Sequence, residues 1–276
     1  MPGDNPVVTS TLRRPVRTLA ALAAVVILWG SSLAAAAPTI GWRLLDTRPH
    51  DRTAFTEGLV KHGAVLLEST GSCCPGEQVA STVRRVDPRT GRVLDARELP
   101  RPLFAEGLTV LRGTAWQLTW LDRVAFSLSP DSLVPQTRVP YAFEGWGLTT
   151  QGSRLLASDG SARLRWLRVP DLRMTRSVDV RDGAQPVTWL NELELLDGVL
   201  WANVWKSDRI ALIDPASGVV RAWLDMSPLR RRVGPGAEVL NGIARDPVTG
   251  HVVVTGKLWD RMFVIRLTEP IPRATR

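Results

Sequence analysis

The chain has 276 residues, 44% of them hydrophobic, and its 35 Lys and Arg against 27 Asp and Glu give a formal net charge of +8. This hydrophobic share is enough for a sizeable core and excludes a disordered chain. The basic residues are scattered, without a polybasic arm or an aromatic-basic stripe, which argues against nucleic-acid binding. Nearly all of them are Arg, since the only lysines are Lys61, Lys206 and Lys257.

The first 37 residues have the pattern of an export signal. Arg13, Arg14 and Arg17 precede an apolar run over 18–37 that ends in small residues, the order found in secretory signals. Cleavage is expected near Ala36. The alternative is an uncleaved membrane anchor, which would be the only membrane contact. We therefore expect an exported protein, extracellular or in the cell envelope, with its folded domain over 38–276.

Two adjacent cysteines, Cys73 and Cys74, stand in the phrase TGSCCPGE. In the oxidising setting of an exported protein they are candidates for a vicinal disulfide. The alternative is a pair of free thiols or an intermolecular bridge. A zinc site needs more ligands than these cysteines and three scattered histidines readily supply, so no metal site is predicted.

A short phrase recurs along the chain after residue 50. It begins with an apolar or aromatic residue, continues with polar residues and ends with an apolar residue. Its copies are FTEGL (55–59), FAEGL (104–108), FEGWGL (143–148), WLNELEL (189–195) and VLNGIA (239–244). Each copy is followed by a strand-like run, and turn phrases such as VDPRTG (86–91) and IDPASG (213–218) recur between them. Five units of roughly 40–50 residues predict an all-β, five-bladed β-propeller.

Equivalent positions in successive blades of a propeller face one axis, so the divergent copies of the phrase are expected to converge on one pocket. The phrases offer Glu57, Glu106, Glu144, Trp146, Asn191, Glu192 and Asn241. The strands that follow add Glu68, Gln117, Trp120, Ser158, Asp159, Trp205 and Lys257. The alternative for each residue is that it satisfies backbone groups around a wet channel. Five further tryptophans are assigned to the core between blades: Trp116, Trp166, Trp189, Trp201 and Trp223.

The phrases FAEGLTV, WQLTW, EGWGLTT, SDGS, LNELELLDGVLWANVWKSD, VLNGIA and VTGKLW, in this order, resemble the plant and bacterial type of glutamine cyclotransferase. The resemblance covers about residues 42–267. It implies a five-bladed propeller that converts the N-terminal glutamine of a peptide or protein to pyroglutamate and releases ammonia, without a catalytic metal. No cofactor is expected, although a structural divalent ion is compatible with the channel. A monomer is expected.

The resemblance also implies roles for individual residues. Glu106 matches the carboxylate that shuttles the proton, and Asn191 and Lys257 match polar groups around the reacting carbonyl. Glu57 stands where the family more often has Gln, and it is expected to pair with a backbone group or with Lys257 rather than to catalyse. Aromatic residues of the substrate pocket are matched by Phe104, Trp120, Trp146 and Trp205.

Other chemistries remain open on the residues alone. Glu57, Glu106 and Glu144 could form the carboxylate pair of an exported glycosidase, or tryptophan faces could bind sugar rings in a non-enzymatic propeller. A lactonase-like propeller that depends on a divalent metal is a third alternative. The fold by itself decides none of these.

Overall fold

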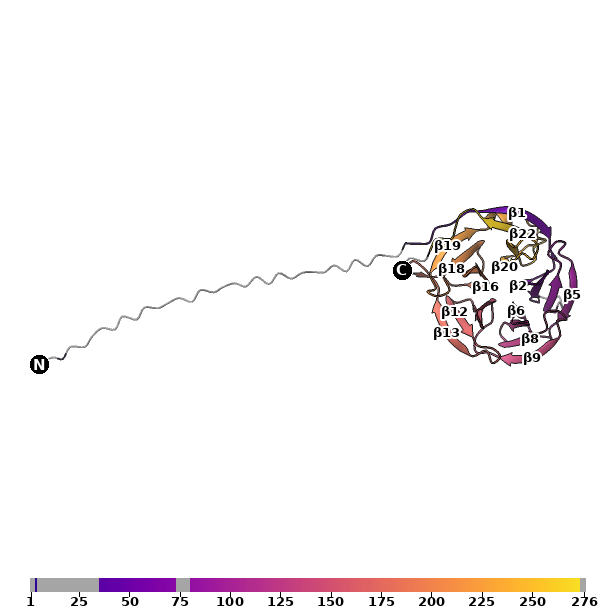
Figure 1. Cartoon of the computed structure of the whole chain (residues 1–276), viewed down its shortest axis with the longest axis horizontal. Coiled ribbons are helices and arrows are strands. Elements are labelled where there is room, and N and C mark those ends of the chain that lie inside the picture. Colours follow the sequence, from indigo (N-terminus) through magenta and orange to yellow (C-terminus); the bar gives the residue numbers. More distant parts are fainter. Residues whose placement is uncertain (1–2, 4–34, 73–79, 274–276) are drawn as a thin grey trace. The chain divides into compact units, whose positions relative to one another are not determined.

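The computed structural model describes residue 3 and residues 35–72 and 80–273. Contacts divide the chain into residues 1–32 and 33–276, and the fold described here belongs to the second unit. Five four-stranded antiparallel sheets are arranged in a ring (Figure 1), which confirms the predicted five-bladed β-propeller. Cys73 and Cys74 lie outside the described residues, as does most of the apolar run over 18–37.

The first four blades are meanders that start at the centre of the ring and end at its periphery, and the outermost strand of the fifth blade comes from the N-terminal end of the domain. The first blade contains β2 (Thr56–His62), β3 (Val65–Thr70), β4 (Thr82–Val86) and β5 (Val93–Glu98). The second contains β6 (Ala105–Leu111), β7 (Thr114–Thr119), β8 (Val124–Leu128) and β9 (Pro135–Pro140). The third contains β10 (Leu148–Gln151), β11 (Arg154–Ala157), β12 (Arg163–Leu167) and β13 (Met174–Asp179).

The fourth blade contains β16 (Leu190–Leu196), β17 (Val199–Val204), β18 (Arg209–Ile213) and β19 (Val220–Asp225). The fifth contains β20 (Leu240–Arg245), β21 (Val252–Gly256), β22 (Arg261–Leu267) and, at its outer edge, β1 (Trp42–Pro49). The recurring phrases therefore begin the innermost strand of every blade. Between blades lie a two-stranded ribbon of β14 (Arg181–Asp182) and β15 (Gln185–Pro186), and the short helix α1 (Ser227–Arg230). No helix among the described residues is long and apolar enough to span a membrane.

The ring is closed by two segments from opposite ends of the domain. Strand β1 pairs antiparallel with β22, with Trp42 opposite Leu267 and Pro49 opposite Arg261. Just before it, residues 38–40 pair with the fourth blade, where Ile40 N donates to Trp223 O at 2.9 Å and Trp223 N donates to Pro38 O at 2.9 Å. Because the N-terminal segment completes a blade made of C-terminal strands, the sheet edges at the two ends of the chain protect each other.

Neighbouring blades pack through apolar side chains, with tryptophans among them. The prediction that five tryptophans lie in this core is correct for the buried residues Trp116, Trp166, Trp201 and Trp223. It is wrong for Trp189, which is 50% exposed and has a left-handed backbone conformation with φ of 64°. Trp189 precedes β16 rather than lying within a strand, so its ring projects beyond the sheet.

Candidate active site

Two carboxylates and one ammonium meet at the inner ends of three blades. Glu57 lies in β2, Glu106 in β6, and Lys257 in the turn directly after β21. Lys257 Nζ is 2.5 Å from Glu57 Oε1, and Glu57 is also hydrogen-bonded to the Glu106 side chain. All three residues are at most 6% exposed. The structure thus contains the expected Glu57–Lys257 pair and adds a direct contact between Glu57 and Glu106.

The two carboxyls hold protons unequally. Burial raises the pKa of Glu106 well above its usual range, and the neighbouring Glu57 carboxylate raises it further, while Lys257 opposes both effects. Burial also raises the pKa of Glu57, but Lys257 counteracts this directly through its ion pair. Ionisation of both adjacent carboxyls is unfavourable, because the two negative charges repel each other. The shared proton therefore resides on Glu106, whose O–H donates to the Glu57 carboxylate.

Amide side chains surround this pair. Asn241, in β20, donates from Nδ2 to Thr56 O at 2.9 Å and to Glu57 Oε2 at 3.3 Å. Asn191, in β16, is 3% exposed, and its Oδ1 has no hydrogen-bond partner within the described structure. The Oδ1 of Asn241 is unpartnered in the same way. Buried polar atoms are normally paired, so these two acceptors are available for a bound molecule.

Aromatic rings cover one side of the cluster. The ring of Phe55 lies 4.5 Å from Lys257 Nζ, in cation–π geometry. Phe104 stands edge-on between Phe55, with centroids 6.3 Å apart, and Trp120, at 5.8 Å. A side chain at Gly71 would overlap the Phe104 ring, so this glycine makes room for it. Phe55 was not singled out from the sequence, although it occupies the same place in its phrase as Phe104.

A second aromatic group continues around the mouth. The Trp146 ring lies 5.7 Å from Trp205 and 6.2 Å from Trp189. The indole N–H groups of Trp120 and Trp146 both donate to Glu144 Oε2, at 3.2 and 3.4 Å. Glu144 therefore joins the two aromatic groups. The indoles are partly exposed, so their faces are accessible at this mouth.

Several residues expected at the pocket serve the scaffold instead. Glu68 and Gln117, on the second strands of their blades, bond between elements of the wall: Glu68 to His50 and Arg84, and Gln117 to Ser69. Ser158 Oγ donates to Asn191 O, and Asp159 pairs with Arg165. The prediction that these four face the funnel is wrong. Glu68 and Gln117 lie one strand away from the axis, and Ser158 and Asp159 follow the end of β11, where their side chains bond to the wall.

Glu192 lies deeper and joins blades across the channel. Its two carboxyl oxygens accept from Leu59 N at 3.4 Å and from Ile243 N at 2.9 Å. Burial raises its pKa well above the usual range, and nearby Glu194 raises it further. Burial raises the pKa of Glu194 itself to about 8. Both carboxyls are thereby shifted toward the neutral form, and both are hydrogen-bonded to groups of the wall.

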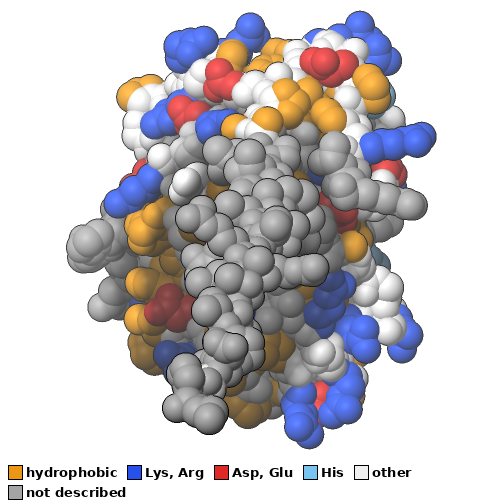
Figure 2. All heavy atoms as spheres, turned by 90° about the vertical axis from the view of Figure 1, so that its left-hand side faces the viewer, with side chains coloured by type: hydrophobic (Ala, Val, Ile, Leu, Met, Phe, Trp, Pro, Cys, Tyr) orange, Lys and Arg blue, Asp and Glu red, His pale blue; other side chains and the backbone are white. Residues whose placement is uncertain are grey.

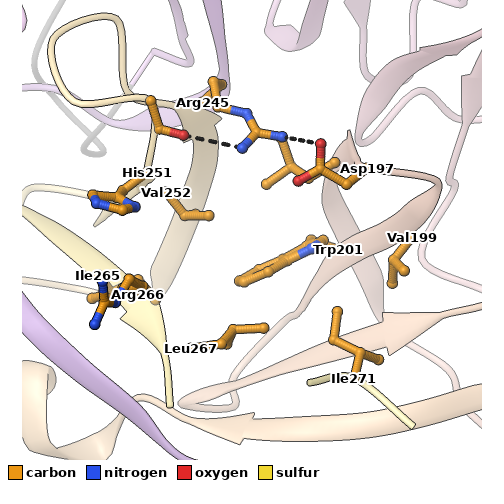
Figure 3. Close-up of a pocket in the computed structure, with 12 residues that line it drawn as sticks. Asp197, Val199, Trp201, Arg245, His251, Val252, Ile265, Arg266, Leu267 and Ile271 are labelled. Atoms are coloured by element: carbon orange, nitrogen blue, oxygen red, sulfur yellow. Dashed lines mark hydrogen bonds and ion pairs between the residues drawn. The ribbon is translucent and has the colours of Figure 1, made fainter. Parts of the chain in front are cut away.

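Within the described residues, no group of three or more His, Asp, Glu or Cys side chains is placed to hold a metal ion. Four cavities among the described residues lie outside the catalytic cluster, and two of them are close to the inner strands or between blades. One, of about 480 Å³, borders it through Lys206, Glu238 and Val239. The other, of about 240 Å³, lies between the fourth and fifth blades (Figure 3), where Trp201 faces Val252 and the Asp197–Arg245 pair closes one side. On the face drawn in Figure 2, Lys and Arg are interspersed with acidic and apolar side chains around the edge.

Comparison with known proteins identifies the family. A family model described as glutamine cyclotransferase matches residues 18–267. The chain belongs to the glutamine cyclotransferase family. A glutaminyl-peptide cyclotransferase from Arabidopsis thaliana is 38% identical over 227 residues, which cover 80% of this chain and 69% of the plant protein. The crystal structure of Myxococcus xanthus glutaminyl cyclase is similar with a TM-score of 0.76 and 36% identity, covering 84% of this chain and 98% of that one.

Membership of the glutamine cyclotransferase family confirms the resemblance inferred from the phrases. The matched range includes every residue of the cluster and both aromatic groups. The individual roles that the resemblance assigns to Glu106, Lys257 and Asn191 stay predictions, and they are carried into the proposal below.

Proposed function

We propose that this protein converts the N-terminal glutamine of peptides or proteins to pyroglutamate and releases ammonia. The observation that carries the proposal is the buried Glu106–Glu57–Lys257 cluster beneath an aromatic mouth, in a member of this family. A single acid–base carboxyl in a partly dry recess suits an intramolecular reaction, which needs a folded substrate and proton transfer but no second substrate.

In the proposed reaction the α-amine of the substrate attacks the γ-carboxamide carbon of the same residue. The aromatic walls hold the side chain folded back on the amine and limit the access of water. The attacking nitrogen must lose a proton and the leaving nitrogen must gain one. Glu106 is the group proposed to do both. Because it holds the proton at rest, it donates first, to the leaving nitrogen, and then accepts the proton of the new ring nitrogen.

The negative charge that develops on the carbonyl oxygen needs a donor nearby. Lys257 is proposed to supply it, with the Asn191 amide as the second polar contact. An unpartnered Asn191 Oδ1 fits a substrate N–H, because a carbonyl oxygen accepts and the substrate amine or amide donates. We further propose that the substrates are encountered outside the cytoplasm, since residues 1–37 have the pattern of an export signal.

Mass spectrometry of a Gln-initiated peptide tests the proposal. Incubation with the purified protein should remove about 17 Da, the mass of the ammonia released on ring closure. The same peptide with an acetylated N-terminus is the matched control, since a blocked amine cannot attack. Absence of the mass loss above the rate without protein would refute the proposed function.

The reaction is proposed to need no metal. Incubation with EDTA should therefore leave the initial rate of cyclisation within about twofold, because a carboxyl and an ammonium supply the acid–base and electrostatic roles that a metal would otherwise take. Activity that disappears with EDTA and returns with zinc would contradict this part of the proposal while leaving the reaction itself standing.

A further inference from the structure

A largely buried group of charged side chains lies next to the catalytic cluster, where the segment between β1 and β2 meets β3 and β4. His50, Glu68, Arg84 and Asp51 are linked in a row: His50 Nε2 is 2.9 Å from Glu68 Oε1, Arg84 Nε is 2.9 Å from Glu68 Oε2, and Arg84 Nη1 is 2.8 Å from Asp51 Oδ2. The His50 and Glu68 side chains are at most 1% exposed. None of these four residues belongs to the proposed reaction.

Both ring nitrogens of His50 face oxygens that accept. Nε2 meets the Glu68 carboxylate, and Nδ1 meets Trp259 O at 2.8 Å. Glu68 already accepts from Thr56 Oγ1 and Arg84, so it is ionised rather than a donor. The Thr255 hydroxyl, 3.3 Å from Nδ1, gives its proton to Arg261 O and also accepts. A neutral imidazole has one N–H, so this arrangement requires the doubly protonated ring.

The bond to Trp259 O connects His50 to the turn that carries Lys257. The same turn is tied to the same segment twice more, by Leu258 N donating to Ala54 O at 2.7 Å and by His50 N donating to Asp260 O at 3.0 Å. At the other end of the network, Glu68 accepts a hydrogen bond from Thr56, the residue directly before Glu57. His50 and Glu68 therefore hold the Lys257 turn and the start of β2 together, and these are the two elements that bring Lys257 to Glu57.

We propose that His50 is a positioning residue for Lys257, held as an imidazolium between Glu68 and the Trp259 carbonyl. The proposal rests on the proposed function, because it assigns Lys257 a part in cyclisation. Protonated His50 holds the turn in the position from which the Lys257 ammonium reaches Glu57 and the substrate. Loss of the proton removes one of the two N–H donors, so the ring loses its hydrogen bond either to Glu68 or to the Trp259 carbonyl and holds the turn less firmly.

The direction of the pH effect follows from the groups around the ring. Burial lowers the pKa of His50, but the Glu68 carboxylate and its hydrogen bond outweigh this, and Arg84 opposes only in part, so the pKa is raised. Arg84 and His50 hold the pKa of Glu68 far below its usual range, and Arg84 and Thr53 lower that of Asp51. The anchoring is therefore complete below the ordinary pKa of a histidine and is lost as pH rises through the raised pKa of His50.

Nuclear magnetic resonance of ¹⁵N-histidine in the wild-type protein tests the charge without any variant that has to fold. The chain has three histidines, and His62 and His251 are partly exposed and serve as references. We expect one ring to stay doubly protonated above about pH 6.5, the ordinary midpoint of a free histidine. This signal should disappear in His50→Asn. A neutral His50 ring at pH 7 would overturn the proposal.

Kinetics test the positioning role. His50→Asn keeps a donor for the Trp259 carbonyl and should lower kcat about 10- to 100-fold with a smaller change in KM, because a displaced catalytic group costs rate more than binding. His50→Leu, of similar size but without a donor, should lose more. His62→Asn, at a surface ion pair with Asp131, is the control and should match wild type. Wild-type kcat in both His50 variants would overturn the proposal.

A double-mutant cycle separates this role from a general structural one. If His50 acts through the Lys257 turn, His50→Asn should cost little in a Lys257→Ala background, because the group that it positions is gone. Independent, additive losses would overturn the proposal. A wild-type protein without cyclase activity would instead refute the proposed function, and the ¹⁵N titration would still decide the charge of His50.

Discussion

At the scale of single residues, Glu106 is the acid–base candidate whose surroundings favour a retained proton. It is buried beside a second carboxylate, and both features favour its protonated form. We predict that Glu106→Gln lowers kcat about 100- to 10,000-fold, the usual contribution of a general acid–base group. The thermal midpoint should change little, because Gln still donates to Glu57. Glu98→Gln, an exposed position on β5, is the control. Full activity in Glu106→Gln would remove this residue from the mechanism.

Glu57 has a different place in the cluster, because its charge is taken up by Lys257. Glu57→Gln removes the neighbouring carboxylate that raises the pKa of Glu106 and leaves Lys257, which lowers it. We therefore predict that the limb of the pH–rate profile governed by Glu106 moves to lower pH. The change in kcat at the optimum should be modest. A limb that moves to higher pH, or a kcat as low as that of Glu106→Gln, would contradict this reading and indicate that both carboxyls react.

The site could be predicted from the sequence where the chemistry lies on the innermost strand, and not where it depends on the register of neighbouring elements. Glu57, Glu106 and Asn241 share a place in the repeated phrase, and they meet in the structure. Glu68 follows the first phrase as closely as Trp120 follows the second, yet it binds His50 between blades. Trp189 was assigned to the core from its sequence. Its exposure depends on a left-handed backbone conformation just before β16, which no sequence pattern indicates.

At the scale of elements, the glycine of the repeated phrase is explained by how closely the innermost strands approach. A Cβ at Gly58 would lie 2.5 Å from Leu108 N, and one at Gly107 would overlap Trp146 O. Gly107 N also donates to Trp146 O at 2.7 Å, so the backbone of the second blade touches that of the third. The carboxylate beside each glycine is thereby brought near the axis, which is why glutamate and glycine recur together.

This contact yields a stability prediction. Gly107→Ala should lower the free energy of unfolding by about 1–3 kcal/mol or more, the usual cost of overpacking, because the obstacle is backbone and cannot rotate away. Chemical denaturation measures the loss. Gly234→Ala is the matched control, since its Cβ would meet only the Asp260 carboxylate at 3.3 Å. Equal stability of the two variants would show that the blades are not held this closely in solution.

At the scale of the whole molecule, closure of the ring depends on the segment that follows the export signal. Residues 38–40 pair with the fourth blade and β1 completes the fifth. Arg48, at the end of β1, donates to both carboxyl oxygens of Asp246, at 2.8 and 3.1 Å, and to Pro88 O at 2.9 Å. Asp246 is fully buried, so its charge is compensated mainly by a residue of the closing strand.

Two truncations and one substitution follow from this arrangement. A chain that starts at Ala37 should keep the thermal midpoint and the activity of the longer chain, because every closing contact described here is retained. A chain that starts at Asp51 lacks β1 and should fail to give a cooperative transition.

Arg48→Met in the longer chain isolates the ion pair. It should lower the free energy of unfolding by about 3–5 kcal/mol, the usual result of leaving one partner of a buried pair uncompensated. Thermal unfolding followed by circular dichroism measures all three. A stable, active chain starting at Asp51 would show that four full blades and a three-stranded fifth hold the site without closure, and the catalytic cluster would then owe its geometry to the inner strands alone.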